Sequence, residues 1–122
     1  MIETELIEVL VNDADVSALV VDRVALTVIP EGSPAPYIVC QLITGQRPGS
    51  LSSTGNRRRL RMQVNCYAQN VLQAKAIVEA AQNAIENYEN FEVVFNGDQD
   101  LYDATTKLCY TVLDYSLTQN PD

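Results

Sequence analysis

Residues 59–85 read RLRMQVNCYAQNVLQAKAIVEAAQNAI, and the spacing of the hydrophobic residues changes within this stretch. Between Leu60 and Ala68 apolar and polar residues alternate, which is typical of a strand with one buried face. From Asn70, a residue type that caps helices, to Tyr88, apolar residues recur every three or four positions. The stretch therefore predicts a strand followed by a helix over residues 70–88, whose apolar stripe covers Leu60, Met62, Val64 and Cys66.

The rest of the chain predicts further helices before this stretch and further strands on both sides of it. Helical spacing predicts a helix over residues 2–11 and a short second helix, capped by Asp15, that ends near residue 20. Runs of β-branched and aromatic residues predict strands over residues 37–44, 91–95 and 107–117, and a short strand or extended segment over residues 24–29. Polar segments predict loops over residues 45–56 and 96–106.

Long strands that follow one another without a helical crossover favour antiparallel pairing. We therefore expect an α+β fold, with an antiparallel sheet of about four strands and helices packed on one face. The length of 122 residues is that of one domain, so we expect residues 1–122 to form a single unit.

Composition excludes several classes of function. The net charge of −8 argues against general affinity for nucleic acid or an anionic membrane. The chain has no histidine, and its three cysteines form no CxxC, so zinc fingers, Cys–His nucleophiles and Ser–His–Asp triads lack their ligands or bases. No apolar run reaches the roughly 18 to 20 residues that span a bilayer, and the acidic N-terminus differs from a secretory signal, which predicts a soluble, cytosolic chain.

Two segments resemble ligand-binding loops only in part. GDQDLYD, residues 97–103, contains Asp98, Asp100 and Asp103 and resembles a calcium loop only superficially, because Asp103 stands where the glycine of position 6 is required and Cys109 where the final glutamate is required. The Gly/Ser-rich loop at residues 45–56 contains no GxxxxGK[ST] motif for phosphate. No pair of carboxylates stands out as an acid/base dyad, so we expect no catalytic site, no metal and no cofactor.

Four of the chain's eight basic residues lie in RRRLR, residues 57–61. They could contact phosphate, or form a charged strand end that resists edge-to-edge aggregation, or pair with acidic residues of a neighbouring subunit. Arg59 and Arg61 fall on the polar face of the predicted strand, and Arg57 and Arg58 lie near the mouth of the loop before it. Composition alone leaves the three interpretations open.

Several segments together resemble a known family. They are DADVSALVVDRV (13–24), the proline-bounded strand entry in IPEGSPAPYIVCQLITG (29–45), the strand RMQVNCYA (61–68) running into an alanine-rich helix, and KLCYTVLDYSL (107–117). In this order and spacing, from Leu6 to Leu117, the chain is similar to the tail-completion, or tail terminator, proteins of long-tailed bacteriophages and related prophages.

The resemblance implies a structural role and no enzymatic activity. Such proteins form a hexameric ring at the head-proximal end of the tail tube, stop its polymerisation and offer a surface for head attachment. The implied partners are further copies of the chain, the tail tube protein and the head–tail connector proteins, with DNA passing through the ring without specific binding. The implied location is the virion, after assembly in the host cytoplasm, with no membrane contact.

Two other functions remain as alternatives. The first is a head–tail connector or stopper ring of similar size, and the second, more remote, is a small nucleic-acid-binding regulator built on the arginine cluster. For a ring-forming protein, interfaces between subunits or with the tube are the expected role of the charged clusters. The residues concerned are Arg57, Arg58, Arg59, Arg61, Asp98, Asp100 and Asp103.

Overall fold

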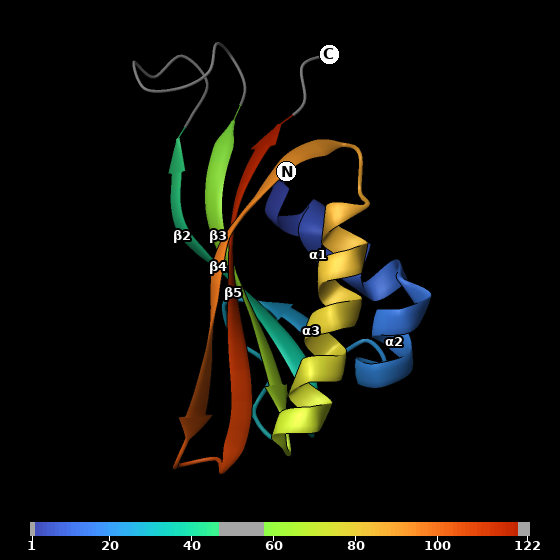
Figure 1. Cartoon of the computed structure of the whole chain (residues 1–122), viewed down its shortest axis with the longest axis vertical. Helices are drawn as coiled ribbons and strands as arrows, with labels where there is room; N and C mark the ends of the chain where they lie inside the picture. Colours follow the sequence, from blue (N-terminus) through green and yellow to red (C-terminus); the bar gives the residue numbers. More distant parts are fainter. Residues whose placement is uncertain (1, 47–57, 120–122) are drawn as a thin grey trace.

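The computed structural model describes residues 2–46 and 58–119, and it packs three helices against one face of a twisted sheet (Figure 1). The helices are α1 (Ile2–Asn12), α2 (Ala14–Val20) and α3 (Val71–Glu86). The strands are β1 (Val24–Leu26), β2 (Tyr37–Gln46), β3 (Arg59–Ala68), β4 (Phe91–Asp103) and β5 (Leu108–Gln119). The predicted α+β class is therefore confirmed. None of the helices in the described part of the chain is both long and hydrophobic enough to traverse a bilayer.

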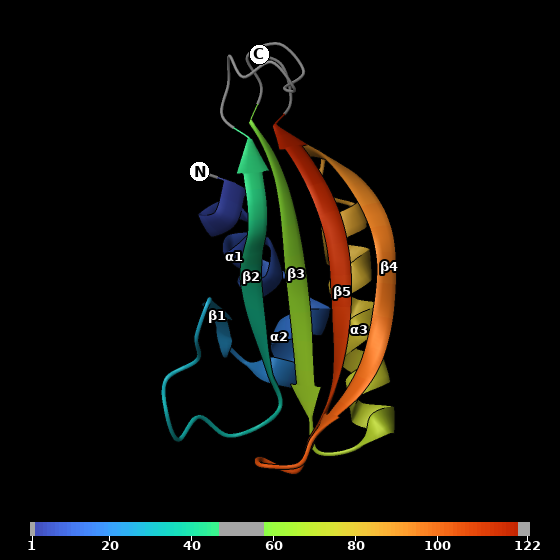
Figure 2. The same ribbon diagram turned by 90° about the vertical axis from the view of Figure 1, so that its left-hand side faces the viewer.

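The sheet has five strands in the order β1-β2-β3-β5-β4, whereas about four antiparallel strands were expected. The additional strand is the short β1, which runs parallel to β2 and pairs Val24 with Ile38 and Leu26 with Cys40. The proline-containing connection between β1 and β2 returns the chain to the start of β1 before β2 begins, so the two strands run in the same direction (Figure 2). All other pairs are antiparallel.

The helix starts follow from capping side chains. Asn70 Oδ1 accepts a hydrogen bond from Gln73 N at 2.9 Å, which confirms the predicted cap of α3. The predicted cap of α2 was wrong by two residues. Asp13, and not Asp15, precedes the helix, and its carboxylate accepts from Asp15 N at 3.1 Å and Val16 N at 3.0 Å.

The acidic segment at residues 96–106 is mostly strand, and the prediction of a loop there was wrong. β4 continues past the expected end at Phe95 to Asp103, in register with β5 from Phe91–Gln119 to Asp103–Leu108. The register shifts between Phe95 and Gly97, where Gly97 adopts a φ of 145° that only glycine takes easily. Pairing with β5 keeps the polar residues extended, so the turn is confined to residues 104–107.

The other predicted loop, residues 45–56, falls almost entirely outside the described residues, since only Gly45 and Gln46 are described and both belong to β2.

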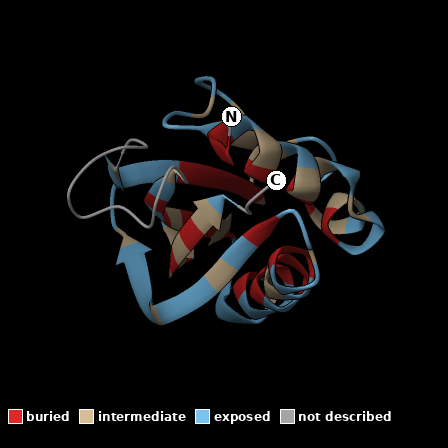
Figure 3. Cartoon of the chain, turned by 90° about the horizontal axis from the view of Figure 1, so that it is seen from above, coloured by how far each residue is buried: buried red, intermediate tan, exposed pale blue. Residues whose placement is uncertain are grey.

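The hydrophobic core lies between the helices and the sheet face that they cover, and Figure 3 shows buried segments gathered there. On β3 the predicted inward residues, Leu60, Met62, Val64 and Cys66, are all at most 1% exposed. They meet the buried stripe of α3, which includes Ile77 and Ile85, as the hydrophobic spacing predicted. No helix of residues 2–46 and 58–119 covers the opposite face of the sheet (Figures 1 and 2), so its side chains and the two sheet edges are open to partners.

Candidate assembly interface

Arg58, expected at an interface, forms an ion pair inside the subunit. It lies just before β3, and its Nη1 and Nη2 atoms donate to the two carboxylate oxygens of Glu3 at 2.7 and 3.0 Å. Glu3 is only 7% exposed, in the first turn of α1. A fork of two parallel bonds fixes both position and orientation, so this pair holds α1 against the start of β3.

Arg61 also forms an ion pair within the subunit, with Asp114 on the outer face of the sheet. Its Nη2 lies 2.7 Å from Asp114 Oδ2, and its Nε donates to the same carboxylate at 3.1 and 3.2 Å. Asn96 Nδ2 donates to Asp114 Oδ1 at 3.1 Å, which ties β4 into the same group. These hydrogen bonds, above all the one from Arg61, hold the pKa of Asp114 below its usual value.

Arg59 differs from its two neighbours. It is exposed on the outer face, and no carboxylate within the described residues pairs with it. Its cross-strand partners are Gln46 on β2 and Thr118 on β5, which are uncharged. Arg57 lies outside the described residues. Arg59 is therefore the described member of the arginine cluster whose charge is available to a partner.

The three aspartates of the acidic segment have different surroundings. Both oxygens of Asp100 accept from Lys75 Nζ at 2.7 Å, and Thr111 Oγ1 donates to Oδ1 at 2.8 Å, so its pKa is lowered. Asp103 accepts from Thr105 N at 2.9 Å and shapes the β4–β5 turn. Asp98 is exposed and makes no hydrogen bond or ion pair that the described residues show.

The arginine cluster and the three aspartates of the acidic segment do not meet within the described part of one subunit. The register pairs Asp98 with Leu113 and Asp100 with Thr111, two buried residues on the helix side of β5. Arg59 and Arg61 occupy the opposite face of the sheet. Nor does any group of three acidic, cysteine or histidine side chains in the described ranges have the spacing of a metal site. A contact between Arg59 and these aspartates can form only between copies of the chain.

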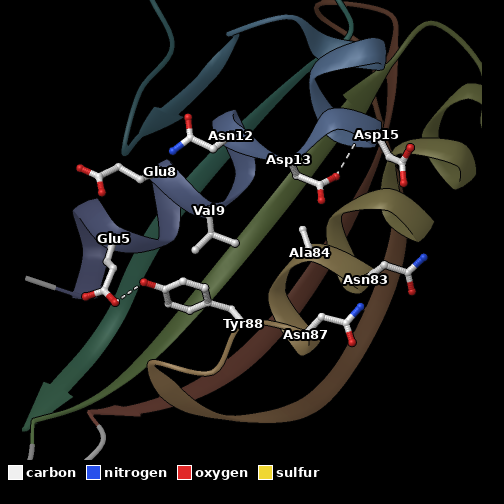
Figure 4. Close-up of a pocket in the computed structure, with 10 residues that line it drawn as sticks. All are labelled: Glu5, Glu8, Val9, Asn12, Asp13, Asp15, Asn83, Ala84, Asn87 and Tyr88. Atoms are coloured by element: carbon white, nitrogen blue, oxygen red, sulfur yellow. Dashed lines mark hydrogen bonds between the residues drawn. The ribbon is translucent and has the colours of Figure 1, made fainter.

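An acidic hollow of about 570 Å³, which the sequence did not predict, lies among the helices (Figure 4). Glu5, Glu8 and Asp13 line it, and Tyr88 donates a hydrogen bond to Glu5 Oε2 at 2.5 Å from the opposite wall. That hydrogen bond is the main reason why the pKa of Tyr88 is raised. The acidic face of the helix predicted at residues 2–11 was the one signal of this hollow in the sequence. That this face lies opposite the end of α3 is seen only in the structure.

The Arg61–Asp114 pair makes a prediction about acid stability. Because the pKa of Asp114 is lower in the folded chain, its ionised form stabilises the fold above the unfolded pKa, and this contribution is lost as the pH falls through the folded pKa. We expect Asp114→Asn to lower Tm by a few degrees at pH 7, and the difference from the unmodified chain to vanish at an acidic pH below the lowered pKa of Asp114. Thermal melts followed by circular dichroism at both pH values would measure it.

Asp98→Asn is the matched control, because it removes the same charge from an exposed position that shows no ion pair within residues 58–119. It should leave Tm nearly unchanged at both pH values. A pH-independent loss for Asp114→Asn would mean that the amide disturbs packing and that the ion pair is not the cause.

Comparison with known proteins places this geometry in a family. Residues 4–119 match the sequence profile of the family described as Tail completion protein gp17. A chain in the virion of a native gene transfer agent particle shares the fold, with a TM-score of 0.71 and 17% identity over 95% of this chain and 92% of that one. An Akkermansia muciniphila crystal structure aligns with a TM-score of 0.42 and 12% identity, over 67% of this chain and 42% of that one. No curated protein matches the sequence.

Proposed function

The chain belongs to the tail completion protein gp17 family, and on this premise we propose that it is the tail terminator of a phage or phage-like particle. In this role six copies form a ring at the head-proximal end of the tail tube. The ring stops the tube from growing further and presents the surface to which the head attaches. The single observation that carries the proposal is the family match, which covers residues 4–119.

The structure supports a ring through the difference between its surfaces. A closed ring needs heterologous contacts, in which one patch of a subunit meets a different patch of the next. This chain has a helix-covered face, an open sheet face and two sheet edges of unlike composition. Arg59, which no described carboxylate binds, and the exposed Asp98 lie on opposite faces of the sheet, so opposite charges are available on separate surfaces.

The charge distribution supports a role beside DNA without specific binding to it. Arg58 and Arg61, which could have contacted phosphates, are already paired with Glu3 and Asp114. The net charge of −8 repels a polyanion, so we propose that DNA passes through the ring without adhering. The same pairing disfavours the nucleic-acid-binding regulator, and the proposed role is purely structural, with no catalysis.

The test is the phenotype of a phage or prophage from which this gene product is removed. Without a terminator, tail tubes should grow beyond their normal length, and the purified protein should appear as rings by negative-stain electron microscopy. It should also sediment with isolated tubes. Tubes of normal length that fail to join heads, with the protein sedimenting with heads, would instead assign the chain to the head–tail connector.

Arg59 is the residue with which to probe the contacts of the ring. We expect Arg59→Glu to shift sedimenting species from the ring toward smaller forms, most clearly at low protein concentration, because it places a carboxylate where an acidic partner surface is expected. The subunit should stay folded, since this side chain is exposed on the outer face. Analytical ultracentrifugation with circular dichroism would measure both.

Lys107→Glu is the control, because it makes the same charge change in the exposed β4–β5 turn. It should assemble as the unmodified chain does. If Arg59→Glu assembled normally and instead abolished a salt-sensitive binding of DNA, the interface assignment would fail and the nucleic-acid function would return.

A further inference from the structure

We infer that adjacent copies of this chain join edge to edge, with residues 41–46 of β2 adding as an antiparallel strand beside residues 91–96 of β4 in the next copy. This inference rests on the proposed ring and names the surfaces that close it. The partner at each edge is a second copy of the same chain. The contact is heterologous, because the β2 edge of one copy meets the β4 edge of the next.

Both edges expose backbone N–H and C=O groups that no described strand pairs with. β1 pairs with β2 only at residues 38–40, so no described strand lies beside residues 41–46 on that side. β4 is the last strand at the other end of the sheet, and within the described residues its outer edge has no neighbour (Figure 2). Unpaired strand edges are templates for pairing with another chain.

The strand directions suit a rotationally symmetric ring. β2 is antiparallel to β3, β3 to β5 and β5 to β4, so β2 and β4 run in opposite directions. Rotation about an axis roughly along the strands keeps each strand's direction. It therefore brings β2 of one copy beside β4 of the next as an antiparallel pair, which continues the alternation already present in the sheet.

Exposed hydrophobic side chains gather at these two edges and at matching levels. Leu42 and Phe95 are the two ends of one cross-strand row, Leu42–Met62–Tyr115–Phe95, and they are 39% and 40% exposed while the two central residues are fully buried. Beside them Ile43 is 42% and Val94 58% exposed. The central strands β3 and β5 show no large exposed hydrophobic residue. Edge-to-edge contact would cover both exposed pairs.

Charge favours this part of the β4 edge over the rest of that strand. Residues 93–96 of β4 and 41–46 of β2 carry no charged side chain, and Glu92 is the one charged residue within residues 91–96. Beyond Gly97, Asp98, Asp100 and Asp103 make β4 acidic, and charged edge residues oppose strand addition. Both uncharged stretches also contain a shift in register, between Leu42 and Thr44 and between Phe95 and Gly97. The proposed pairing is therefore confined to the end of the sheet that contains residues 41–46 of β2 and 91–96 of β4.

Disulfide trapping between two variants tests the inference. Ile43→Cys and Val94→Cys are each made in a Cys109→Ser background, because Cys40 and Cys66 are buried and Cys109 is only half-buried. After mild oxidation, a mixture of the two should give a covalent dimer on a non-reducing gel, and neither variant alone should. The double variant should give a ladder of multimers. Ile43→Cys mixed with Leu72→Cys, whose leucine is 83% exposed on α3, is the control and should give none.

A second measurement is independent of the exact register. Val94→Lys should raise the concentration needed for half-assembly about tenfold, as expected for the lost burial of one valine side chain. Leu72→Lys, at a more exposed apolar site on α3 away from both edges, should not.

The outcomes separate the inference from the proposed function. Rings that form normally with Val94→Lys, or without the mixed crosslink, would overturn the edge contact and leave the terminator role intact. Dimers of Ile43→Cys alone would show a two-fold contact and also overturn it. If the unmodified chain, mixed with isolated tail tubes, gave neither rings nor shorter tubes, the proposed function itself would fail.

Discussion

Replacing Val64 by aspartate is expected to remove a large part of the chain's stability at neutral pH. Val64 is fully buried on β3, paired with Cys40 and Leu113 and enclosed in the core that α3 covers. A carboxylate there would lose its hydration without gaining a cationic partner, at a cost of at least about 4 kcal/mol. A domain of this size is stable by roughly 5–15 kcal/mol, so the variant should lose a large part of its stability and unfold at a much lower urea concentration. Ile77→Asp, on the facing side of α3, should act in the same way.

The matched control places the same carboxylate on the other side of the sheet. Gln41 is exposed on the outer face of β2, next in sequence to Cys40, so Gln41→Asp changes charge without burial. It should alter the free energy of unfolding by no more than about 0.5 kcal/mol. Urea titrations followed by circular dichroism would compare the variants. A cooperative transition for Val64→Asp at the unmodified midpoint would show that the assigned inner face is wrong.

The strand–helix unit at residues 59–86 was predictable because its two hydrophobic periods are local and uninterrupted. The extension of β4 to Asp103 was not, because its polar residues are held extended by pairing with β5 and not by any preference of their own. The sequence pattern ends where Asn96 and Gly97 interrupt the alternation, although the strand continues beyond this irregularity. The end of a strand cannot be predicted from the strand's own sequence when pairing with a neighbouring strand determines it.

The arginine cluster was also visible in the sequence, but its partners were not. Arg58 pairs with Glu3 across 55 positions of the chain, and Arg61 with Asp114 across 53. Nothing local links these residues, because the topology of the sheet and the packing of α1 bring them together. Of the described arginines in the cluster, Arg59 is therefore the one that we still propose to contact a neighbouring subunit.

Removing the guanidinium of Arg58 is expected to lower the stability of the subunit strongly. Arg58→Met keeps most of the apolar stem but removes the guanidinium, and this leaves the 7% exposed Glu3 without its two hydrogen bonds. An uncompensated buried carboxylate costs about 3 kcal/mol. We therefore expect the urea midpoint to fall clearly and the start of α1 to lose protection in amide hydrogen exchange. Arg59→Met, which removes a guanidinium that no described carboxylate binds, should do neither.

A double-mutant cycle separates the attraction within the pair from the cost of leaving one partner alone. Glu3→Leu combined with Arg58→Met replaces both charged groups by apolar ones, and such exchanges in partly buried sites are often close to neutral. The double variant should therefore be more stable than Arg58→Met alone, because the carboxylate that Arg58→Met leaves without its hydrogen bonds is also removed. If its loss equals the sum of the two single losses, Arg58 and Glu3 act independently. The contact of α1 with the start of β3 would then depend on hydrophobic packing by Ile2 and Leu6, which lie on the buried face of the same helix.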